Sequence, residues 1–332
     1  MTEIPARGRV VHTGQAVVDL VMQISALPVT GSDVFARSAT FTAGGGFNVM
    51  AAAARDGAKV VYVGGHGSGP FGDIVRAAMT SVGVQVMSAQ HPSMDTGFSV
   101  ALVDDEAERT FISSLGAEGH VVIDDYRAVE LTSGDVVYVS GYSLLHTANR
   151  AALVAWLPTV PDGVVVVVDP SPLVAEIPSD ALAIVCGRAD IWSTNRSEAG
   201  LLIREPNLVV TDLAGRLRDH VDCTVVLRDG QDGCWIAPRD PLAPLLHMPG
   251  APVQALDTNG AGDTHTGVLA AEVALGNDIE GAARRANIAA AISVTRHGPA
   301  TSPERSEIDL ALADRSAELG FVAPGLSGSS AR

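Results

Sequence analysis

The run DTNGAGDTHTG, residues 257–267, holds the side chains best suited to chemistry. Three small residues, Gly260, Ala261 and Gly262, stand where a loop turns into an apolar helical stretch. Free N–H groups at a helix N-terminus attract an anion, and small side chains let a phosphate approach the backbone. Asp263 follows in the first turn, where its carboxylate could take a proton from a hydroxyl that attacks phosphorus. A plain N-capping Asp after a glycine turn would explain the same pattern.

Two further motifs favour the catalytic interpretation. The glycine triplet 44–46 opens an alanine-rich helical stretch, in which Asn48 offers both donors and acceptors to a polyol. Asn195 and Glu198 lie one helical turn apart, so the carboxylate could hold Mg²⁺-bound water near phosphates. Each motif alone is weak, because flexible glycine turns and surface N-x-x-E patterns are common. Together with Asp263 they indicate phosphoryl transfer.

These residues need a scaffold, and the apolar pattern predicts one. Continuous apolar runs separated by helical patterns indicate a doubly wound, mainly parallel α/β sheet flanked by helices. The expected strands include 59–63, 135–139, 163–169 and 189–193, and the expected helices are 48–55, 71–82, 150–156, 262–276, 279–296 and about 306–319.

Other segments alternate between apolar and polar residues, which predicts a small half-exposed sheet. Its expected parts are 33–43 and 96–115, the second folded as a hairpin at the acidic turn 104–106. A small sheet beside an α/β body suggests a lid over the active site, and an edge extension of the main sheet is the alternative. We expect one α/β domain over 1–320 with these segments inserted, and a flexible polar tail over 321–332.

Composition excludes several functions. The chain has 332 residues, a net charge of −16 and 47% hydrophobic residues, which allow a large core but disfavour nucleic-acid partners. It shows no leader-like hydrophobic segment and no apolar run long enough to span a bilayer, so we expect no membrane partner and a cytoplasmic location. Its three cysteines form no C-x-x-C pair, so zinc and redox motifs are unsupported.

The motifs together resemble the ribokinase, or PfkB, family of sugar kinases over roughly residues 10–306. The stretch GGGFNVMAAAARDGA is similar to the family's N-terminal signature, and DTNGAGD matches its highly specific C-terminal signature D-T-x-G-A-G-D. The pair Asn195 and Glu198 matches its N-x-x-E motif, and GQDG at 230–233 matches its G-x-x-G nucleotide loop.

This resemblance implies a ribokinase-like fold with a small β-sheet lid, and a homodimer formed through that lid. It implies ATP-dependent phosphorylation of a primary hydroxyl of a small sugar. A nucleoside kinase is the alternative, which a large apolar side chain at the acceptor pocket would favour, with Phe41, Phe47 and Phe98 as candidates. A non-enzymatic sugar-binding regulator is more remote, because Asp263 and the small triplet before it are intact.

The resemblance also implies roles for individual positions. Asp263 corresponds to the catalytic base, and the N–H groups of Gly260, Ala261 and Gly262 to the anion hole. The substrate-binding candidates are Asp19, Gly44, Gly45 and Asn48; the ATP-binding candidates are Asn195, Arg228, Gly230, Gly233 and Asn287. Glu198 is the Mg²⁺ candidate, through water, while Asp257 and Asn259 are candidates for a monovalent cation such as K⁺.

Several positions depart from the family or remain open. Gly45 stands where ribokinase carries a Lys, which weakens the case for ribose, and Arg228 stands where Thr is common. His265 replaces a frequent aromatic residue, and packing is its expected role. Asp169 either faces the phosphates or begins a turn before Pro170. Arg109 either reaches an anionic group of the substrate or lies solvated at a strand edge.

A literal G-x-G-x-x-G at 67–72 makes a dinucleotide-dependent oxidoreductase the competing enzyme class. Pro70 and Phe71 make this turn bulky, and no carboxylate ends a strand about 20 residues later, as that fold requires. Structural glycines are the better interpretation.

Overall fold

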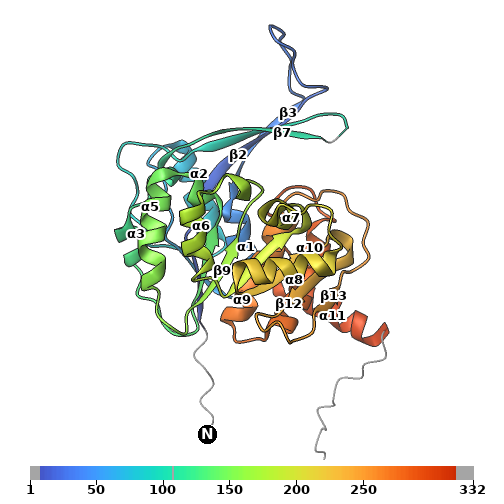
Figure 1. Cartoon of the computed structure of the whole chain (residues 1–332). Helices are drawn as coiled ribbons and strands as arrows, with labels where there is room; N and C mark the ends of the chain where they lie inside the picture. The colour runs from blue at the N-terminus through green and yellow to red at the C-terminus, as the bar shows by residue number, and fades with distance from the viewer. Residues whose placement is uncertain (1–7, 107, 319–332) are drawn as a thin grey trace, which may run out of the picture.

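The computed structural model describes residues 8–106 and 108–318, and its main body is a nine-stranded sheet with helices on both faces (Figure 1). The strand order across the sheet is β13 (Leu246–Pro249), β12 (Gly233–Ala237), β11 (Thr224–Arg228), β10 (Ile191–Asn195), β9 (Val165–Asp169), β8 (Val136–Ser140), β1 (Arg9–His12), β4 (Lys59–Tyr62) and β5 (Gln85–Val86). Neighbours from β11 to β5 run parallel, and β12 and β13 are antiparallel. The predicted fold class is confirmed.

The strands of this sheet are apolar on both sides because both sides are covered. Val10 packs into the core on one face and its neighbour Val11 into the core on the other. One face is covered by α1 (Gly46–Arg55), α2 (Pro70–Ser81), α9 (Ala261–Ala274), α10 (Ile279–Ser293) and α11 (Arg305–Glu318). The other is covered by α3 (Ile123–Arg127), α5 (Thr147–Trp156), α6 (Ser179–Cys186), α7 (Arg196–Ile203) and α8 (Val210–Val221), with the short α4 (Tyr142–Leu145) before α5.

The expected helices and strands of this body are present, and their ends differ from the predictions by a few residues. The expected C-terminal tail at 321–332 lies outside the described residues.

A separate small sheet has the order β3 (Ser38–Gly45), β2 (Ala16–Gln23), β6 (Phe98–Val103) and β7 (Arg109–Ser114). The hairpin between β6 and β7 was predicted, but one expected boundary was wrong and one strand was missed. Residues 33–37 form no strand, so β3 starts at Ser38. The central strand β2 was not predicted as part of this sheet, although it contains Asp19.

The register of the small sheet decides which side chains share a face, because directly paired residues point to the same side. Asp19 pairs with Thr42 and Ser99, and Ser99 pairs with Ser113, so these four polar side chains lie together. We call this side the Asp19 face. The opposite side, the outer face, carries Leu20 paired with Phe41 and Val100 paired with Ile112.

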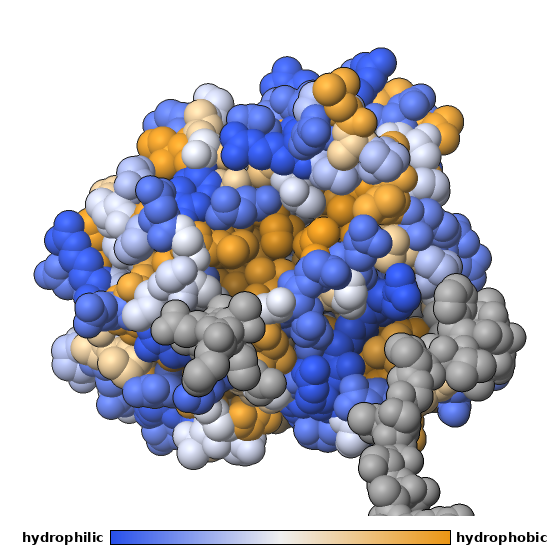
Figure 2. Space-filling view, turned by 90° about the horizontal axis from the view of Figure 1, so that it is seen from below, coloured by the Kyte–Doolittle hydropathy of each residue, from blue (hydrophilic) through white to orange (hydrophobic). Residues whose placement is uncertain are grey.

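The small sheet stands at the top of the main body in Figure 1, beyond the strand ends that carry the polar residues. Asp169, Asn195 and Arg228 are the last residues of β9, β10 and β11, so they meet at the carboxyl edge of the parallel sheet. In open α/β sheets ligands bind at that edge. The underside of the molecule, away from the small sheet, mixes hydrophilic and hydrophobic residues (Figure 2). In the part of the chain described, no helix combines the length and apolar character needed to cross a bilayer.

Candidate active site

Asp263 lies in the first turn of α9, and backbone geometry explains the residues around it. Gly260 adopts the left-handed conformation with φ of 76°, and an added Cβ would lie 2.0 Å from the carbonyl oxygen of Pro299. No other residue fits there without moving the backbone. Gly267, two turns later, lets α9 approach α1, because a Cβ would lie 2.5 Å from the carbonyl oxygen of Val49.

Close packing of these two helices brings Asn48 to Asp263. Asn48 Nδ2 donates to Asp263 Oδ2 at 2.9 Å, across most of the chain. The other polar atom of this buried amide, Oδ1, has no hydrogen-bond partner among the described protein groups. A buried acceptor in this state is suited to a hydroxyl of a bound ligand.

Two carboxylates face this site and repel one another. Burial raises the pKa of Asp263 to about 6, a rise that the hydrogen bond from Asn48 limits and the charge of Asp169 increases. Burial also raises the pKa of Asp19 to about 6, and the charge of Asp263 adds to this rise. Gly44 makes room for Asp19, since a Cβ there would lie 1.9 Å from Asp19 Oδ2. The structure therefore brings together four of the candidate site residues, Asp263, Asn48, Asp19 and Gly44.

One of the three N–H groups of the predicted anion hole already has a partner within the protein. The Ala261 N–H already donates to the carbonyl oxygen of Thr258, at a long 3.3 Å. Gly260 and Gly262 flank it at the start of α9, with no side chain to shield their N–H groups. An anion at this helix start would therefore compete with Thr258 for one of the three expected donors.

Arg228 lies beneath the anion hole in a cage of acceptors. Its Nη1 donates to Asp169 Oδ2 at 3.0 Å and to the Gly262 carbonyl oxygen at 3.3 Å, and Nη2 donates to Glu198 Oε2 at 3.4 Å. Further Nη1 partners are Ser193 Oγ and Thr266 Oγ1. The side chain is 11% exposed, so this guanidinium offsets two carboxylates in a largely dry setting. Arg228 was predicted from the sequence as an ATP-binding candidate, but its hydrogen bonds to Asp169, Gly262 and Glu198 were not predicted.

Asn195 and Glu198 form a capping box at the start of α7. Asn195 Oδ1 accepts the Glu198 N–H at 2.9 Å, and Glu198 Oε2 accepts the Asn195 N–H at 3.0 Å and the Thr194 hydroxyl at 2.9 Å. Burial and the charge of Asp169 raise the pKa of Glu198, while Arg228 lowers it. Carboxylate oxygens of this kind fit an indirect, water-mediated contact with Mg²⁺. Within the described residues, no group of three or more His, Cys, Asp or Glu side chains is arranged to bind a metal directly.

The two glycines of the predicted nucleotide loop both have positive φ. Gly230 and Gly233 have φ of 58° and 93°, and a Cβ on Gly233 would lie 2.2 Å from the carbonyl oxygen of Met248. Asn287 is buried beside this loop, where Nδ2 donates to the Met248 carbonyl oxygen at 2.7 Å and Oδ1 pairs with His265 Nε2. Burial lowers the pKa of His265 to about 3, so it is a neutral core residue, as the expected packing role requires.

The N–H groups of the G-x-G-x-x-G loop at 67–72 are hydrogen-bonded to a side chain of the protein itself. The N–H groups of Gly69, Phe71 and Gly72 all donate to the carboxylate of Asp95. Burial alone would raise the pKa of Asp95, but these bonds outweigh it and lower that pKa. The loop's donors are therefore engaged by a protein anion, which supports the structural interpretation of its glycines.

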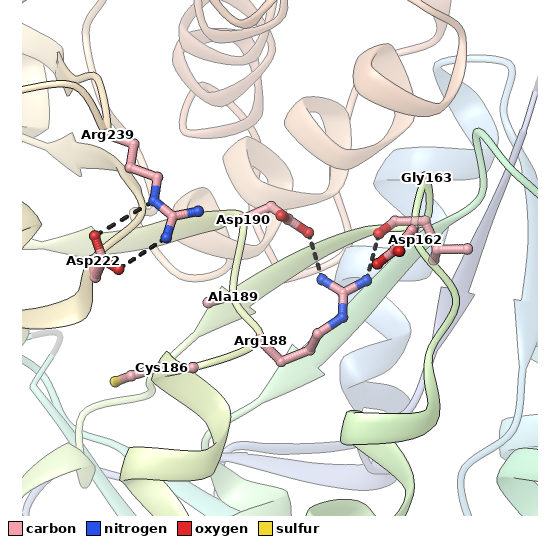
Figure 3. Close-up of a pocket in the computed structure, with 10 residues that line it drawn as sticks. Asp162, Gly163, Cys186, Arg188, Ala189, Asp190, Asp222 and Arg239 are labelled. Carbon is pink, nitrogen blue, oxygen red and sulfur yellow. Dashed lines mark hydrogen bonds and ion pairs between the residues drawn. The ribbon is translucent and has the colours of Figure 1, made fainter.

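A cavity of about 210 Å³ lies at the amino ends of β9, β10 and β11, at the sheet edge opposite to Asp169 and Arg228. Figure 3 shows its two arginines turned toward carboxylates. Arg188 donates to Asp190 at 2.8 Å and Arg239 to Asp222 at 2.9 Å. Both arginines of this cavity are thus paired with carboxylates of its own lining.

Comparison with known proteins agrees with this geometry. The family profile described as pfkB family carbohydrate kinase matches residues 7–306. An *Escherichia coli* K12 protein named uncharacterized sugar kinase YegV is 28% identical over 314 residues, covering 94% of this chain and 96% of that protein. *Mus musculus* ribokinase is 28% identical over 314 residues, covering 91% and 94% of the two chains.

Solved structures share the fold. *Thermotoga maritima* ribokinase gives a TM-score of 0.76 at 20% identity, covering 92% of this chain and 99% of its own. *Arabidopsis thaliana* ribokinase, solved with ribose and ATP, gives 0.75 at 22% identity, covering 92% and 98%. Adenosine kinase from *Sinorhizobium meliloti* gives 0.77 at 22% identity, covering 94% and 100%.

Fold, site and relatives together define a phosphotransferase with an alcohol acceptor. The chain belongs to the PfkB family of carbohydrate kinases, whose profile covers nearly all of it.

Proposed function

We propose that this protein transfers the γ-phosphoryl group of ATP to a primary hydroxyl of a small sugar, with Asp263 as the base. The observation that supports this most directly is the Asp263–Asn48 contact at the start of α9. This contact brings the helix that follows the glycine triplet 44–46 to the carboxylate that follows the small residues 260–262. A pKa of about 6 leaves that carboxylate ionised at neutral pH and makes it a stronger base than an ordinary Asp.

In the proposed reaction the acceptor oxygen forms a bond to the γ-phosphorus as the bond from phosphorus to the ADP oxygen breaks. The hydroxyl proton passes to Asp263, which also orients the oxygen for attack. The start of α9 stabilises charge on the transferring group through its N–H groups and helix dipole. Mg²⁺ that accompanies ATP would offset phosphate charge, with Glu198 and Asp169 as the side chains that could hold it through water.

The acceptor would lie between Asp263 and the Asp19 face of the small sheet, which acts as a lid and excludes water. The polar members of that face suit a polyol. Ser113 Oγ donates to Ser99 Oγ at 3.0 Å beside Asp19, so hydroxyl and carboxylate groups stand together. Asn48 Oδ1 supplies a further unpaired acceptor.

The aromatic candidates for a nucleoside pocket do not lie on this face. Phe47 is buried in the core at 6% exposure. Phe41 and Phe98 belong to the outer face and both pack on Phe71 of α2, with ring centroids 6.0 and 5.2 Å away. Phe111, which is half-exposed, is the aromatic residue that shares the Asp19 face. These positions favour a sugar, and Phe111 keeps the nucleoside alternative open.

ATP turnover over a panel of sugars, sugar acids and nucleosides tests the proposal. We expect turnover with a small sugar, together with a higher melting temperature when that sugar is bound. A sugar that raises the melting temperature without any ATP turnover would instead support a non-enzymatic sugar-binding regulator. Turnover confined to nucleosides would favour the alternative kinase, and Phe111→Ala should then weaken acceptor binding.

We also infer a homodimer through the outer face of the small sheet, where Phe41 and Ile112 are 51% and 63% exposed. Ile112→Glu would place a charge in the interface and should halve the mass measured by light scattering. Leu242→Glu, at a residue 92% exposed on the main body, is the matched control and should leave the mass unchanged. A monomeric wild type would contradict this inference.

A further inference from the structure

Arg109 links the small sheet to the loop that precedes the anion hole. Its Nη2 donates to Asp257 Oδ1 at 2.6 Å, across 148 residues of chain. The two side chains are 27% and 10% exposed, so the ion pair is largely shielded from water. Arg109 begins β7, and its register with Val103 places it on the same side of the sheet as Asp19. The arginine is therefore neither a solvated edge residue nor, in this arrangement, free to reach an anionic substrate.

The Asp257 carboxylate organises both chain segments that support the anion hole. Oδ1 also accepts the Asn259 N–H at 2.9 Å, and Oδ2 accepts the Gly298 N–H at 3.0 Å. Asn259 directly precedes Gly260, and Gly298 directly precedes Pro299, whose carbonyl oxygen abuts Gly260. Burial alone would raise the pKa of Asp257, but the two N–H groups and Arg109 outweigh it and lower that pKa. The carboxylate is thus ionised, and both of its oxygens accept from protein donors, two at Oδ1 and one at Oδ2.

This arrangement does not fit the monovalent cation expected at Asp257 and Asn259. Such a cation needs a shell of oxygen ligands, whereas the oxygens of Asp257 here face a guanidinium and two N–H donors. A second positive charge within a few ångströms of the guanidinium would be repelled in this shielded setting. The charge that a cation would supply is already present in the protein.

We propose that the guanidinium of Arg109 takes the place of a monovalent cation beside Asp257, so that the small sheet itself orders the anion-hole loop. Closing of the small sheet would bring the arginine to Asp257 and stabilise the turn before Gly260. Opening of the small sheet would separate Arg109 from Asp257. Arg109 is then a positioning residue that acts through Asp257, and the protein needs no K⁺ because the cation belongs to the lid.

Melting temperature and turnover measured in potassium, sodium and tetramethylammonium chlorides at equal ionic strength test this proposal. We expect the wild type to respond equally to the three salts. Arg109→Ala should lose about 10-fold or more in turnover, since small displacements of a catalytic loop are costly. K⁺ should restore much of this loss and raise the variant's melting temperature, whereas tetramethylammonium should do neither. Arg109→Lys should keep part of the activity without K⁺.

Arg37→Ala is the matched control, because Arg37, directly before β3, also forms an ion pair, with Asp105 of the turn after β6, but both partners are 56% exposed. That variant should show no K⁺ response. Three results would overturn the proposal: K⁺ activation of the wild type as strong as that of Arg109→Ala, full activity of Arg109→Ala without K⁺, or a loss that no cation restores. The melting arm needs no substrate and does not rest on the proposed function. A K⁺-specific shift in Arg109→Ala alone would therefore support the proposal even if the sugar panel failed.

Discussion

Asp263→Asn should lower turnover by roughly 10²-fold or more while the dissociation constants of sugar and ATP change by only a few-fold. The variant keeps the size of the side chain and an oxygen for Asn48, but it loses the basic carboxylate. General base catalysis contributes about 10²–10⁴-fold in comparable cases, which sets the expected loss. Single-turnover kinetics with the sugar identified in the panel would measure it, and near-normal turnover would show that Asp263 is not the base.

The same substitution should stabilise the protein at high pH. The folded-state pKa of Asp263 is raised to about 6 from an ordinary 3.8, so the ionised carboxylate is disfavoured in the folded state. The resulting stability penalty grows as pH rises through that interval and is complete above about pH 6, where it is on the order of 1–3 kcal/mol. Asp263→Asn should therefore melt higher than the wild type at pH 8, and this gain should disappear near pH 4. A variant that is both inactive and less stable at pH 8 would point to lost structure instead.

Asp19→Asn is the matched control, because burial also raises the pKa of Asp19 to about 6. It should raise the melting temperature at pH 8 in the same way, but weaken sugar binding more than turnover. In the wild type, kcat/KM should fall below about pH 6, where the site gains a proton. Because the charge of Asp263 raises the pKa of Asp19, this acid limb reports on the pair and not on one residue.

The parts of the candidate site that lie close together in the chain could be predicted from the sequence. Gly260 and Asp263 stand three residues apart, so the loop-to-helix turn and its carboxylate could be predicted together. The parallel sheet was also predictable, because strands such as β9 are apolar on both sides only when both faces are covered.

What could not be predicted depends on contacts between distant segments. The strand β2 reads AVVDLVMQ, which lacks the clean alternation of an exposed sheet, so its central place in the small sheet was missed. Without β2 the register was unknown, and Phe41 could not be assigned to the outer face. The partner of Arg109 lies 148 residues away, and nothing near Arg109 in the sequence indicates it. The cage around Arg228 likewise forms only where the ends of three strands and the start of α9 meet.

Arg228→Ala should destabilise the protein by about 3–5 kcal/mol, the range typical of breaking a buried ion pair. The substitution would leave the carboxylates of Asp169 and Glu198 facing each other with side chains 13% and 6% exposed. Arg228 also bonds to the Gly262 carbonyl oxygen, so α9 would lose a support directly beneath the anion hole. Urea unfolding of the variant and the wild type at pH 8 would measure the difference.

Arg196→Ala is a suitable comparison, because Arg196 pairs with Asp229 near the same sheet edge but is 51% exposed. An exposed pair contributes at most about 1 kcal/mol, so this variant should unfold close to the wild type. A similar small loss in Arg228→Ala would mean that water or rearrangement compensates both carboxylates.

The pH dependence of the Arg228→Ala loss separates charge from packing. Burial and the charge of Asp169 raise the pKa of Glu198, and Arg228 partly offsets this rise. Removing the guanidinium should therefore raise the pKa of Glu198 further. The raised pKa makes the ionised form costly in the folded state, and protonation relieves the cost as pH falls. We therefore expect a larger loss at pH 8 than at pH 5, whereas a packing defect would cost the same at both. If the loss follows the charge, Arg228 is what allows two carboxylates to stand where ATP phosphates must approach, and the variant should also bind ATP more weakly at pH 8 than at pH 5.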